Sequence, residues 1–362
     1  MSEDLDDGEL GERLAARTLE LVDVPSESRD EAALTGRVAG ILRAGGVEVL
    51  DLGDSCVLAR PAGTRPAVLL AGHLDTVPAQ GNRPGRRTGE RVHGLGTSDM
   101  KGALAVMIEL ALAGAPFACL FFGREELPVA ESALGPLLAR GRELIAAELV
   151  VMMEPTDNAI HAGCLGNINA TWSFHGRSGH SARPWLADNA IHRAAAAIAG
   201  LARQEPEPHE FDGLVFREVA SVTRIAGGIA ANVVPDLAEA HVNYRYAPGR
   251  SPAEAQARLA ALCPGGELRI DSNAPSGPVA AANPHAQRLA AVGALEVAPK
   301  QAWTPVAEFG LAGIDAINFG PGEPARAHTR DESITVGALV RCHRVLEAFA
   351  TEALTSAPRE AL

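Results

Sequence analysis

Acidic and histidine side chains recur where short apolar runs of this chain end or where the following loop begins. The runs 67–71, 117–122 and 149–153 are apolar and bounded by Gly or Pro, which predicts strands of a parallel sheet buried on both faces. Open α/β sheets bind their ligands at the carboxyl ends of such strands. Because the side chains come from segments far apart in sequence, their arrival at one edge predicts a metal site. The candidate ligands are His73, Asp99, Glu125, Glu126, Glu154 and His328.

Two of these residues have local patterns that suggest roles. In His73-Leu74-Asp75, positions two apart point the same way if the backbone is extended, so the Asp75 carboxylate can orient the imidazole. The triplet alone also fits a histidine that binds no metal. Asp99 precedes a helix expected to begin near Met100, and a helix N-cap is its ordinary interpretation. The joint occurrence of all the candidates therefore carries the metal prediction.

The glutamates offer a division of labour. Glu125 and Glu126 follow an apolar strand, where two acids are commonly solvated loop residues. As neighbours, one carboxylate could bind a metal while the other stays free as a base. Glu154 ends a very apolar strand, where an unpaired carboxylate would be costly to bury unless a cation meets it.

The elements that must position these side chains change character along the chain. From about residue 10 to 160, helices and strands alternate, which predicts a mostly parallel α/β sheet with helices on both faces. Near Ile168 the pattern becomes βαββαβ, typical of a ferredoxin-like α+β insert. The α/β pattern returns after about Asn283. We therefore expect a first domain split into 1–168 and 283–362, with an inserted dimerisation or lid domain at 169–282.

Composition excludes several classes of protein. A formal charge of −13, from 32 basic and 45 acidic residues, argues against a nucleic-acid binder. We expect no membrane partner, because no apolar run approaches the ~18 residues of a span and the N-terminus lacks the pattern of a signal peptide. The five cysteines are widely spaced without a CxxC pair, which fits reduced thiols in a cytoplasmic protein.

Seven motifs, in order along nearly the whole chain, resemble one family: GHLDTVP, GLGTSDMKG, REE, MEPT, GHSARP, NVVP and FGPGEPARAHTRDE. The family is that of zinc-dependent amidohydrolases and exopeptidases, which includes aminoacylases, glutamate-releasing carboxypeptidases and succinyl-diaminopimelate desuccinylases. The resemblance implies two Zn²⁺ per chain, with Co²⁺ able to substitute. It implies that His73 and Glu154 bind one ion, that Glu126 and His328 bind the other, and that Asp99 bridges them.

The resemblance also assigns catalytic and substrate roles. Glu125 would be the general base, serving two ions roughly 3.5–4 Å apart that hold a hydroxide and polarise an amide carbonyl. In the insert, His180 would reach the tetrahedral oxyanion, commonly from a partner subunit, so a homodimer through the insert is expected. The expected substrate-binding residues are Asn232 and Arg245, with Arg183 as a further donor and Gly322 allowing close approach of the backbone.

Longer stretches, among them GHSARPWLADNAIHRAA and AWTPVAEFGLAGIDAINFGPGEPARAH, resemble the actinobacterial type of desuccinylase. The leading interpretation is hydrolysis of an N-succinyl amino acid in diaminopimelate and lysine synthesis. The alternatives are another N-acyl amino acid amidohydrolase or dipeptidase, and a non-catalytic binding protein on this fold. Three departures from the relatives bear on the acyl substrate: Arg124 before the glutamate pair, Pro305 after Thr304, and Glu308.

Overall fold

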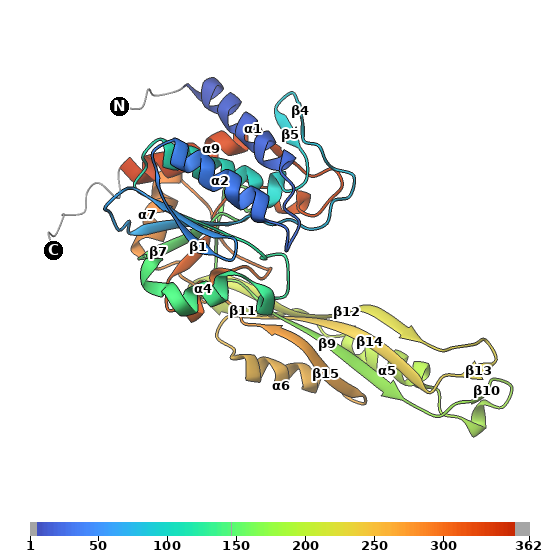
Figure 1. The fold of residues 1–362 in the computed structure, drawn as a ribbon. Helices are drawn as coiled ribbons and strands as arrows, with labels where there is room; N and C mark the ends of the chain where they lie inside the picture. The colour runs from blue at the N-terminus through green and yellow to red at the C-terminus, as the bar shows by residue number, and fades with distance from the viewer. Residues whose placement is uncertain (1–5, 146, 352–362) are drawn as a thin grey trace. The chain divides into compact units, whose positions relative to one another are not determined.

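The computed structural model describes residues 6–145 and 147–351, which divide into two compact units (Figure 1). Unit 1 comprises Met1–Gly163, Pro278–Ala298 and Thr304–Leu362, and unit 2 comprises Cys164–Gly277 and Pro299–Trp303. The sequence pattern placed the boundaries at 168/169 and 282/283, a few residues from these. The return of 299–303 to unit 2 was not anticipated. Gln301 and Trp303 make that connection, because their side chains donate to the carbonyls of Val215 and Pro275.

Unit 1 is built on an eight-stranded sheet with the order β1-β2-β6-β3-β7-β17-β8-β16. Strand β3 pairs in parallel with β6 and β7, and β17 pairs in parallel with β7, whereas β1, β2 and β8 add antiparallel pairs. The predicted mostly parallel sheet is thus confirmed at its centre. Its strands are β1 (Glu48–Gly53), β2 (Cys56–Arg60), β3 (Val68–His73), β6 (Ala118–Phe122), β7 (Leu149–Met152), β8 (Ile160–Ala162), β16 (Val297–Pro299) and β17 (Ala316–Asn318).

Helices cover both faces of this sheet (Figure 1). Helices α1, α3 and α9 pack against one another, and α4 packs against α8. Helix α3 is buried on nearly all sides, in keeping with its almost wholly apolar sequence. A three-stranded sheet of β4 (Arg86–Thr88), β5 (Arg91–His93) and β18 (Ser333–Thr335) lies alongside. The helices are α1 (Asp7–Asp23), α2 (Ala32–Ala44), α3 (Gly102–Leu112), α4 (Leu134–Gly141), α7 (Pro284–Gly293), α8 (Val306–Leu311) and α9 (Val336–Phe349).

Unit 2 has the predicted ferredoxin-like βαββαβ order, with three additional strands, β10, β11 and β13. Its antiparallel sheet has the order β11-β12-β14-β9-β15, in which β11 is the addition. A short pair, β10 with β13, lies outside this sheet. The elements are β9 (Gly166–His175), β10 (Gly179–His180), α5 (Ala190–Leu201), β11 (Glu207–Phe211), β12 (Leu214–Gly227), β13 (Val233–Val234), β14 (Leu237–Tyr246), α6 (Pro252–Leu262) and β15 (Glu267–Ala274).

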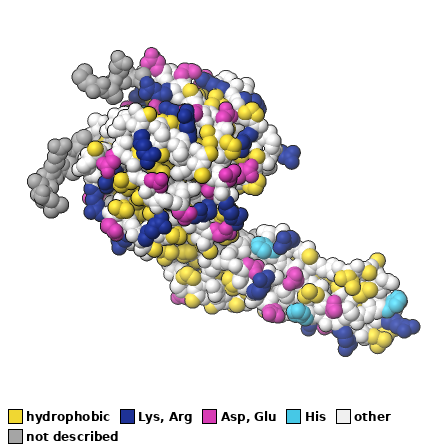
Figure 2. Space-filling model, in the orientation of Figure 1, with side chains coloured by type: hydrophobic (Ala, Val, Ile, Leu, Met, Phe, Trp, Pro, Cys, Tyr) yellow, Lys and Arg dark blue, Asp and Glu magenta, His cyan; other side chains and the backbone are white. Residues whose placement is uncertain are grey.

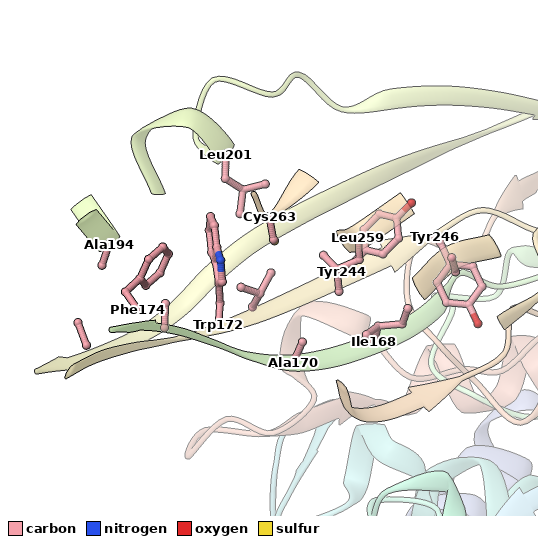
Figure 3. Packing of buried hydrophobic residues seen from close by; sticks show 14 of the residues in the cluster. Ile168, Ala170, Trp172, Phe174, Ala194, Leu201, Tyr244, Tyr246, Leu259 and Cys263 are labelled. Atoms are coloured by element: carbon pink, nitrogen blue, oxygen red, sulfur yellow. The ribbon is translucent and has the colours of Figure 1, made fainter. Parts of the chain in front are cut away.

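The core of unit 2 follows from strict alternation along β9, where every second side chain is buried. Trp172 and Phe174 of β9 pack with Tyr244 of β14 beneath α5 and α6, which contribute Leu201 and Leu259 (Figure 3). Aromatic side chains of this kind contribute strongly to the energetics of a core because each buries a large area. Within the described residues, no helix of the protein is both long and apolar enough to cross a membrane.

A buried carboxylate joins α8 to the start of α4. Glu308 is 5% exposed, and its Oε2 accepts a hydrogen bond of 3.2 Å from Ser132 Oγ. The same hydroxyl accepts from the backbone N–H of Leu134. Burial raises the pKa of Glu308 to about 7, against the opposing effect of hydrogen bonds from Ser132 and the Gly135 N–H. The folded protein therefore keeps a proton on Glu308 at pH values where the unfolded chain has lost it.

This raised pKa predicts a pH-dependent stability difference between wild type and Glu308→Gln. Between about pH 4.5 and 7 the wild type should lose stability as pH rises, because ionising Glu308 favours the unfolded state. The glutamine variant stays neutral, so its free energy of unfolding relative to wild type should rise by roughly 1–3 kcal/mol from pH 5 to pH 8. Urea unfolding at both pH values measures this. Exposed Glu143→Gln is the control, and equal pH slopes for wild type and Glu308→Gln would contradict the prediction.

Candidate metal centre

His73 lies at the carboxyl end of β3, the central strand of unit 1, and is almost fully buried. Its Nδ1 is 3.0 Å from the Asp75 carbonyl oxygen. Donation from Nδ1–H to that carbonyl would leave the Nε2 lone pair free for a cation. Nε2 lies 3.1 Å from Asp99 Oδ1 and 3.8 Å from Glu154 Oε1. Nε2 is therefore aimed at carboxylate oxygens from two other segments.

Asp99 stands between the two predicted histidine ligands, with one carboxylate oxygen toward each. Oδ1 faces His73 Nε2, and Oδ2 lies 3.4 Å from His328 Nε2. Helix α3 begins later, at Gly102, with Lys101 at its N-cap, so Asp99 does not serve as the cap of this helix. A carboxylate with its two oxygens directed to two imidazoles has the arrangement of a bridging ligand.

Glu126 and His328 complete the second half of this arrangement. Glu126 Oε1 is 2.8 Å from His328 Nε2, and His328 has a φ of +61°, a left-handed conformation uncommon for residues other than glycine. One ligand atom from each of Asp99, Glu126 and His328 lies within 4.8 Å of the others, and the same holds for His73, Asp99 and Glu154. The donor set is oxygen and nitrogen only, which suits zinc and other borderline divalent metals.

Asp75 has a different principal contact from the one that the sequence suggested. The predicted carboxylate contact with His73 is long, at 3.6 Å from Oδ1 to Nδ1, and the closer partner of the imidazole is the Asp75 carbonyl. The carboxylate instead accepts the backbone N–H groups of Glu125 and Glu126, at 2.9 and 3.0 Å, and the Ser28 hydroxyl. Asp75 thus holds the loop that carries the two glutamates. Sequence spacing alone held no signal for this contact.

Glu154 follows β7 and is held by close packing of three loops. An added Cβ at Gly322 would lie 2.1 Å from the Ser98 carbonyl oxygen and 2.8 Å from Pro155 Cβ. The Gly322 carbonyl also accepts from the N–H of Asp157, at 2.8 Å. Gly322 therefore brings the segments of Asp99 and Glu154 into contact with the loop that leads to His328. Its predicted role toward substrate remains a proposal.

The site carries more negative than positive charge. In the described part of the chain, no Lys or Arg forms an ion pair with Asp99, Glu125 or Glu126. Hydrogen bonds to Asp99 and Glu126 raise the pKa of His328 to about 10. Burial, with the nearby Glu154 carboxylate, raises the pKa of Glu125 well above its usual range. Such shifts are typical of a carboxylate cluster that a divalent cation would stabilise, because metal binding would displace these protons.

The departures from the relatives have structural partners in unit 1. Arg124 adopts a positive φ of 59°, and its guanidinium donates to Asp54 Oδ2 and to the Glu131 carbonyl, at 2.6 and 2.8 Å. Glu308 is buried against Ser132, and Thr304 is 1% exposed. Arg124 and Glu308 both restrain the segment between the glutamate pair and α4. These contacts give Arg124 and Glu308 a structural role in this segment.

The predicted residues of unit 2 lie at two ends of its sheet. His180 at the end of β10 and Arg183 after it are exposed, and the Ser181 N–H donates to the Asn232 carbonyl at 3.0 Å. Arg245 lies near the opposite end of β14, where it is paired with Asn167 of β9. The eight residue steps from Leu237 to Arg245 correspond to roughly 25 Å of strand. Within one chain, Asn232 and Arg245 therefore lie near opposite ends of the sheet, and their roles toward substrate remain predictions.

A further cluster that the sequence did not reveal joins Glu207, His209 and Glu218 of unit 2. Arg250 pairs with Glu218 at 2.6 Å, and Arg258 pairs with Glu207 at 2.7 Å. Two guanidinium groups already compensate its carboxylates. The cluster is thus an ion-pair network, unlike the one in unit 1.

Comparison with known proteins identifies close relatives. A succinyl-diaminopimelate desuccinylase of Corynebacterium glutamicum is 34% identical over 351 residues, 92% of this chain and 95% of that protein. A Mycobacterium tuberculosis protein provisionally given the same name is 39% identical over 341 residues, 92% of this chain and 96% of its own length. The N-acetyl-L-citrulline deacetylase of Xanthomonas campestris is 32% identical over 314 residues, 82% of this chain and 84% of that protein.

The fold has relatives among solved structures. The aminopeptidase PepT of Bacillus cereus superposes with a TM-score of 0.74 at 21% identity, covering 94% of this chain and 97% of its own. This likeness concerns the fold alone. Residues 69–352 match the model of peptidase family M20/M25/M40, and this span includes every candidate ligand. The chain therefore belongs to peptidase family M20/M25/M40.

Proposed function

We propose that this protein is a metal-dependent amide hydrolase that converts N-succinyl-LL-diaminopimelate to succinate and LL-diaminopimelate, a step of diaminopimelate and lysine synthesis. The observation that carries the hydrolase assignment is Asp99, whose two oxygens face two histidines while Glu125 lies beside the cluster. The 34% identity with a desuccinylase, over 92% of this chain, supports the assignment of the substrate. We place the reaction in the cytoplasm, in keeping with five buried free thiols.

The two ligand groups would hold two zinc ions per chain, with Asp99 shared between them. Bound ions would polarise the amide carbonyl and make water a nucleophile at neutral pH. His73 ends strand β3 and Glu154 lies two residues after β7, whereas Glu126 and His328 lie on loops. The proposed ligands are His73, Asp99 and Glu154 for one ion, and Asp99, Glu126 and His328 for the other.

Glu125 remains for proton transfer in this assignment. Its neighbour Glu126 contacts His328, and both backbone N–H groups are fixed by Asp75. Burial raises the pKa of Glu125, so its carboxylate, once ionised, is a stronger base than an exposed glutamate. A carboxylate in such a place can accept a proton from the attacking water and then donate it to the departing amine. The same residue would serve both steps.

Unit 2 offers a surface for a second copy of the chain. Strand β11 pairs with β12 from Leu214 to Glu218. The rest of β12, as far as Gly227, is therefore an exposed sheet edge. Ile225 on this edge and Ile229 beyond it are 53% and 88% exposed, and Figure 2 shows hydrophobic side chains exposed along this unit. Pairing of two such edges would cover both. This supports the proposed homodimer.

The separation of His180 from Arg245 supports action between chains. The two lie near opposite ends of one sheet, roughly 25 Å apart along β14, which is farther than a small N-acyl amino acid extends. One copy of unit 2 cannot therefore offer both to one substrate. We propose that Arg245 binds substrate carboxylate and that His180, with Asn232 and Arg183 nearby, completes the site of a second chain.

Arg245 suits the recognition of a carboxylate. Its Nε donates to Asn243 Oδ1 at 2.9 Å, and Asn243 in turn donates to Asn167 and Asn169. Within the described residues, its terminal nitrogens have no hydrogen-bond partner, so the fork can bind a carboxylate through two parallel hydrogen bonds. A substrate with several carboxylates requires such a donor in a protein of net charge −13.

A second candidate activity is deacylation of another N-acyl amino acid. The 32% identity with the N-acetyl-L-citrulline deacetylase specifically favours it over peptide cleavage. The same centre would serve either reaction, since only the acyl group and the amino acid differ. The two candidates are therefore separated by substrate preference.

The first test compares substrates on metal-loaded wild-type enzyme. We expect the highest kcat/KM for N-succinyl-LL-diaminopimelate, above N-acetyl amino acids and dipeptides. Arg245→Lys should lower kcat/KM for this substrate by roughly 1.5–3 kcal/mol of transition-state stabilisation, because lysine cannot reproduce the bidentate fork. Exposed Arg269→Lys on β15 is the matched control. Faster cleavage of N-acetyl-citrulline would favour the second candidate instead.

The glutamate pair can be divided by mutation. Glu125→Gln should lower turnover at least ~100-fold without changing metal content, because it removes the proton acceptor and no proposed ligand. Glu126→Gln should instead weaken binding of one ion. Activity assays measure turnover, and elemental analysis with zinc titration measures metal binding. We expect two ions per chain for wild type. The reverse behaviour of the two variants would exchange their roles.

Subunit mixing tests the role of His180. His180→Ala and Glu125→Gln chains should each be nearly inactive, and mixed dimers should recover activity, because one of their sites would combine an intact base with an intact histidine. Differently tagged chains allow exchange to be verified by native mass spectrometry. Verified heterodimers without recovered activity would rule out action between chains.

A further inference from the structure

Glu332 is a buried carboxylate on the loop that carries His328. It is 1% exposed, and it accepts three backbone hydrogen bonds from the segment of Asp99. Oε2 accepts the N–H of Gly96 at 2.8 Å, while Oε1 accepts those of Ser98 and Asp99 at 2.9 and 3.0 Å. One carboxylate thus fixes the backbone from Gly96 to Asp99.

These N–H groups precede α3, which begins at Gly102, so the helix does not supply their acceptors. Hydrogen bonds to an ionised acceptor are roughly twice as strong as neutral ones. Within the described residues, Glu332 forms no ion pair with Lys, Arg or His, and its two carboxylate oxygens accept these three backbone N–H groups. Burial of a carboxylate is costly unless hydrogen bonds or a charge partner compensate it. Such an arrangement is best explained by a need to fix the backbone conformation from Gly96 to Asp99.

The same loop is tied to the other side of the Asp99 segment. The Glu332 carbonyl accepts the Gly94 N–H at 3.1 Å, and Ser333 pairs with His93 between β18 and β5. Four residues before Glu332, His328 directs Nε2 toward Asp99 Oδ2. Glu332 therefore sets the position of the Asp99 backbone relative to the loop of His328.

We propose that Glu332 is a positioning residue for the Asp99, Glu126 and His328 group. It holds Asp99 so that Oδ2 faces His328, and it contacts neither substrate nor metal. His73 ends strand β3 and Glu154 lies two residues after β7, so the site on the strands depends on this contact only through the shared Asp99. Loss of Glu332 should therefore weaken the site on the two loops more than the site on the two strands. This inference rests on the proposed dinuclear function.

The test is stepwise titration of the metal-free full-length chain with Zn²⁺ by calorimetry, and with Co²⁺ by visible absorption. In Glu332→Gln, an amide NH₂ replaces one acceptor oxygen. We expect the ion of the Asp99, Glu126 and His328 site, which is the one that Glu126→Gln weakens, to lose at least about tenfold in affinity, with the other ion changed far less. The Co²⁺ spectrum of the second ion should change in intensity, and kcat should fall with little change in KM.

Two further variants make this test specific. Glu323→Gln, in the same loop, removes a carboxylate that pairs with Arg91 at 2.9 Å, and it should bind both ions as wild type does. Glu332→Asp keeps the charge but is too short to reach all three amides, so we expect an intermediate loss. It also serves if the glutamine variant does not fold.

The outcomes separate this inference from the proposed function. Two ions bound normally by Glu332→Gln and Glu332→Asp would overturn the positioning role alone. Equal weakening of both ions together with a lowered Tm would also overturn it, because that result indicates a general structural role. A wild-type chain that binds only one ion would overturn the dinuclear function and this inference together.

Discussion

The mutual repulsion of carboxylates at one sheet edge is the constraint on which unit 1 depends. Asp99, Glu125, Glu126 and Glu154 converge there with two imidazoles, and the described residues supply no Lys or Arg ion pair for Asp99, Glu125 or Glu126. Such a group is unfavourable unless protons or cations compensate it. The pKa of His328, raised to about 10 by Asp99 and Glu126, is one expression of that field. Divalent cations shared through Asp99 would be another.

The surrounding structure holds this group together. Parallel pairing of β3 with β7 fixes the ends that carry His73 and Glu154, and Gly322 lets three loops approach to backbone contact. Carboxylates that accept backbone N–H groups position the remaining ligands. Asp75 does this for the glutamate pair and Glu332 for the Asp99 segment. These loops are therefore held by carboxylates that are not among the proposed metal ligands.

Unit 2 separates the residues expected to bind substrate. An amide network on β9 and β14 supports Arg245 at one end of the sheet, whereas His180 and Asn232 lie beside the short β10–β13 pair at the other. A long sheet with an open β12 edge makes this separation useful if two chains associate. In such a dimer, residues that one sheet holds apart could be brought to the same site by two different chains.

The sequence by itself determined the fold class and the identity of the metal-site candidates. Apolar runs before His73, Glu125 and Glu154 predicted buried parallel strands, and strand ends meet at one edge whatever the loop details. Only the tertiary structure decided which oxygen of Asp99 faces which histidine. It also decided that the Asp75 and Glu332 carboxylates bind backbone amides and that Asn232 lies far from Arg245. These contacts depend on loop conformation and strand register, which join residues distant in sequence and leave no local periodic signal.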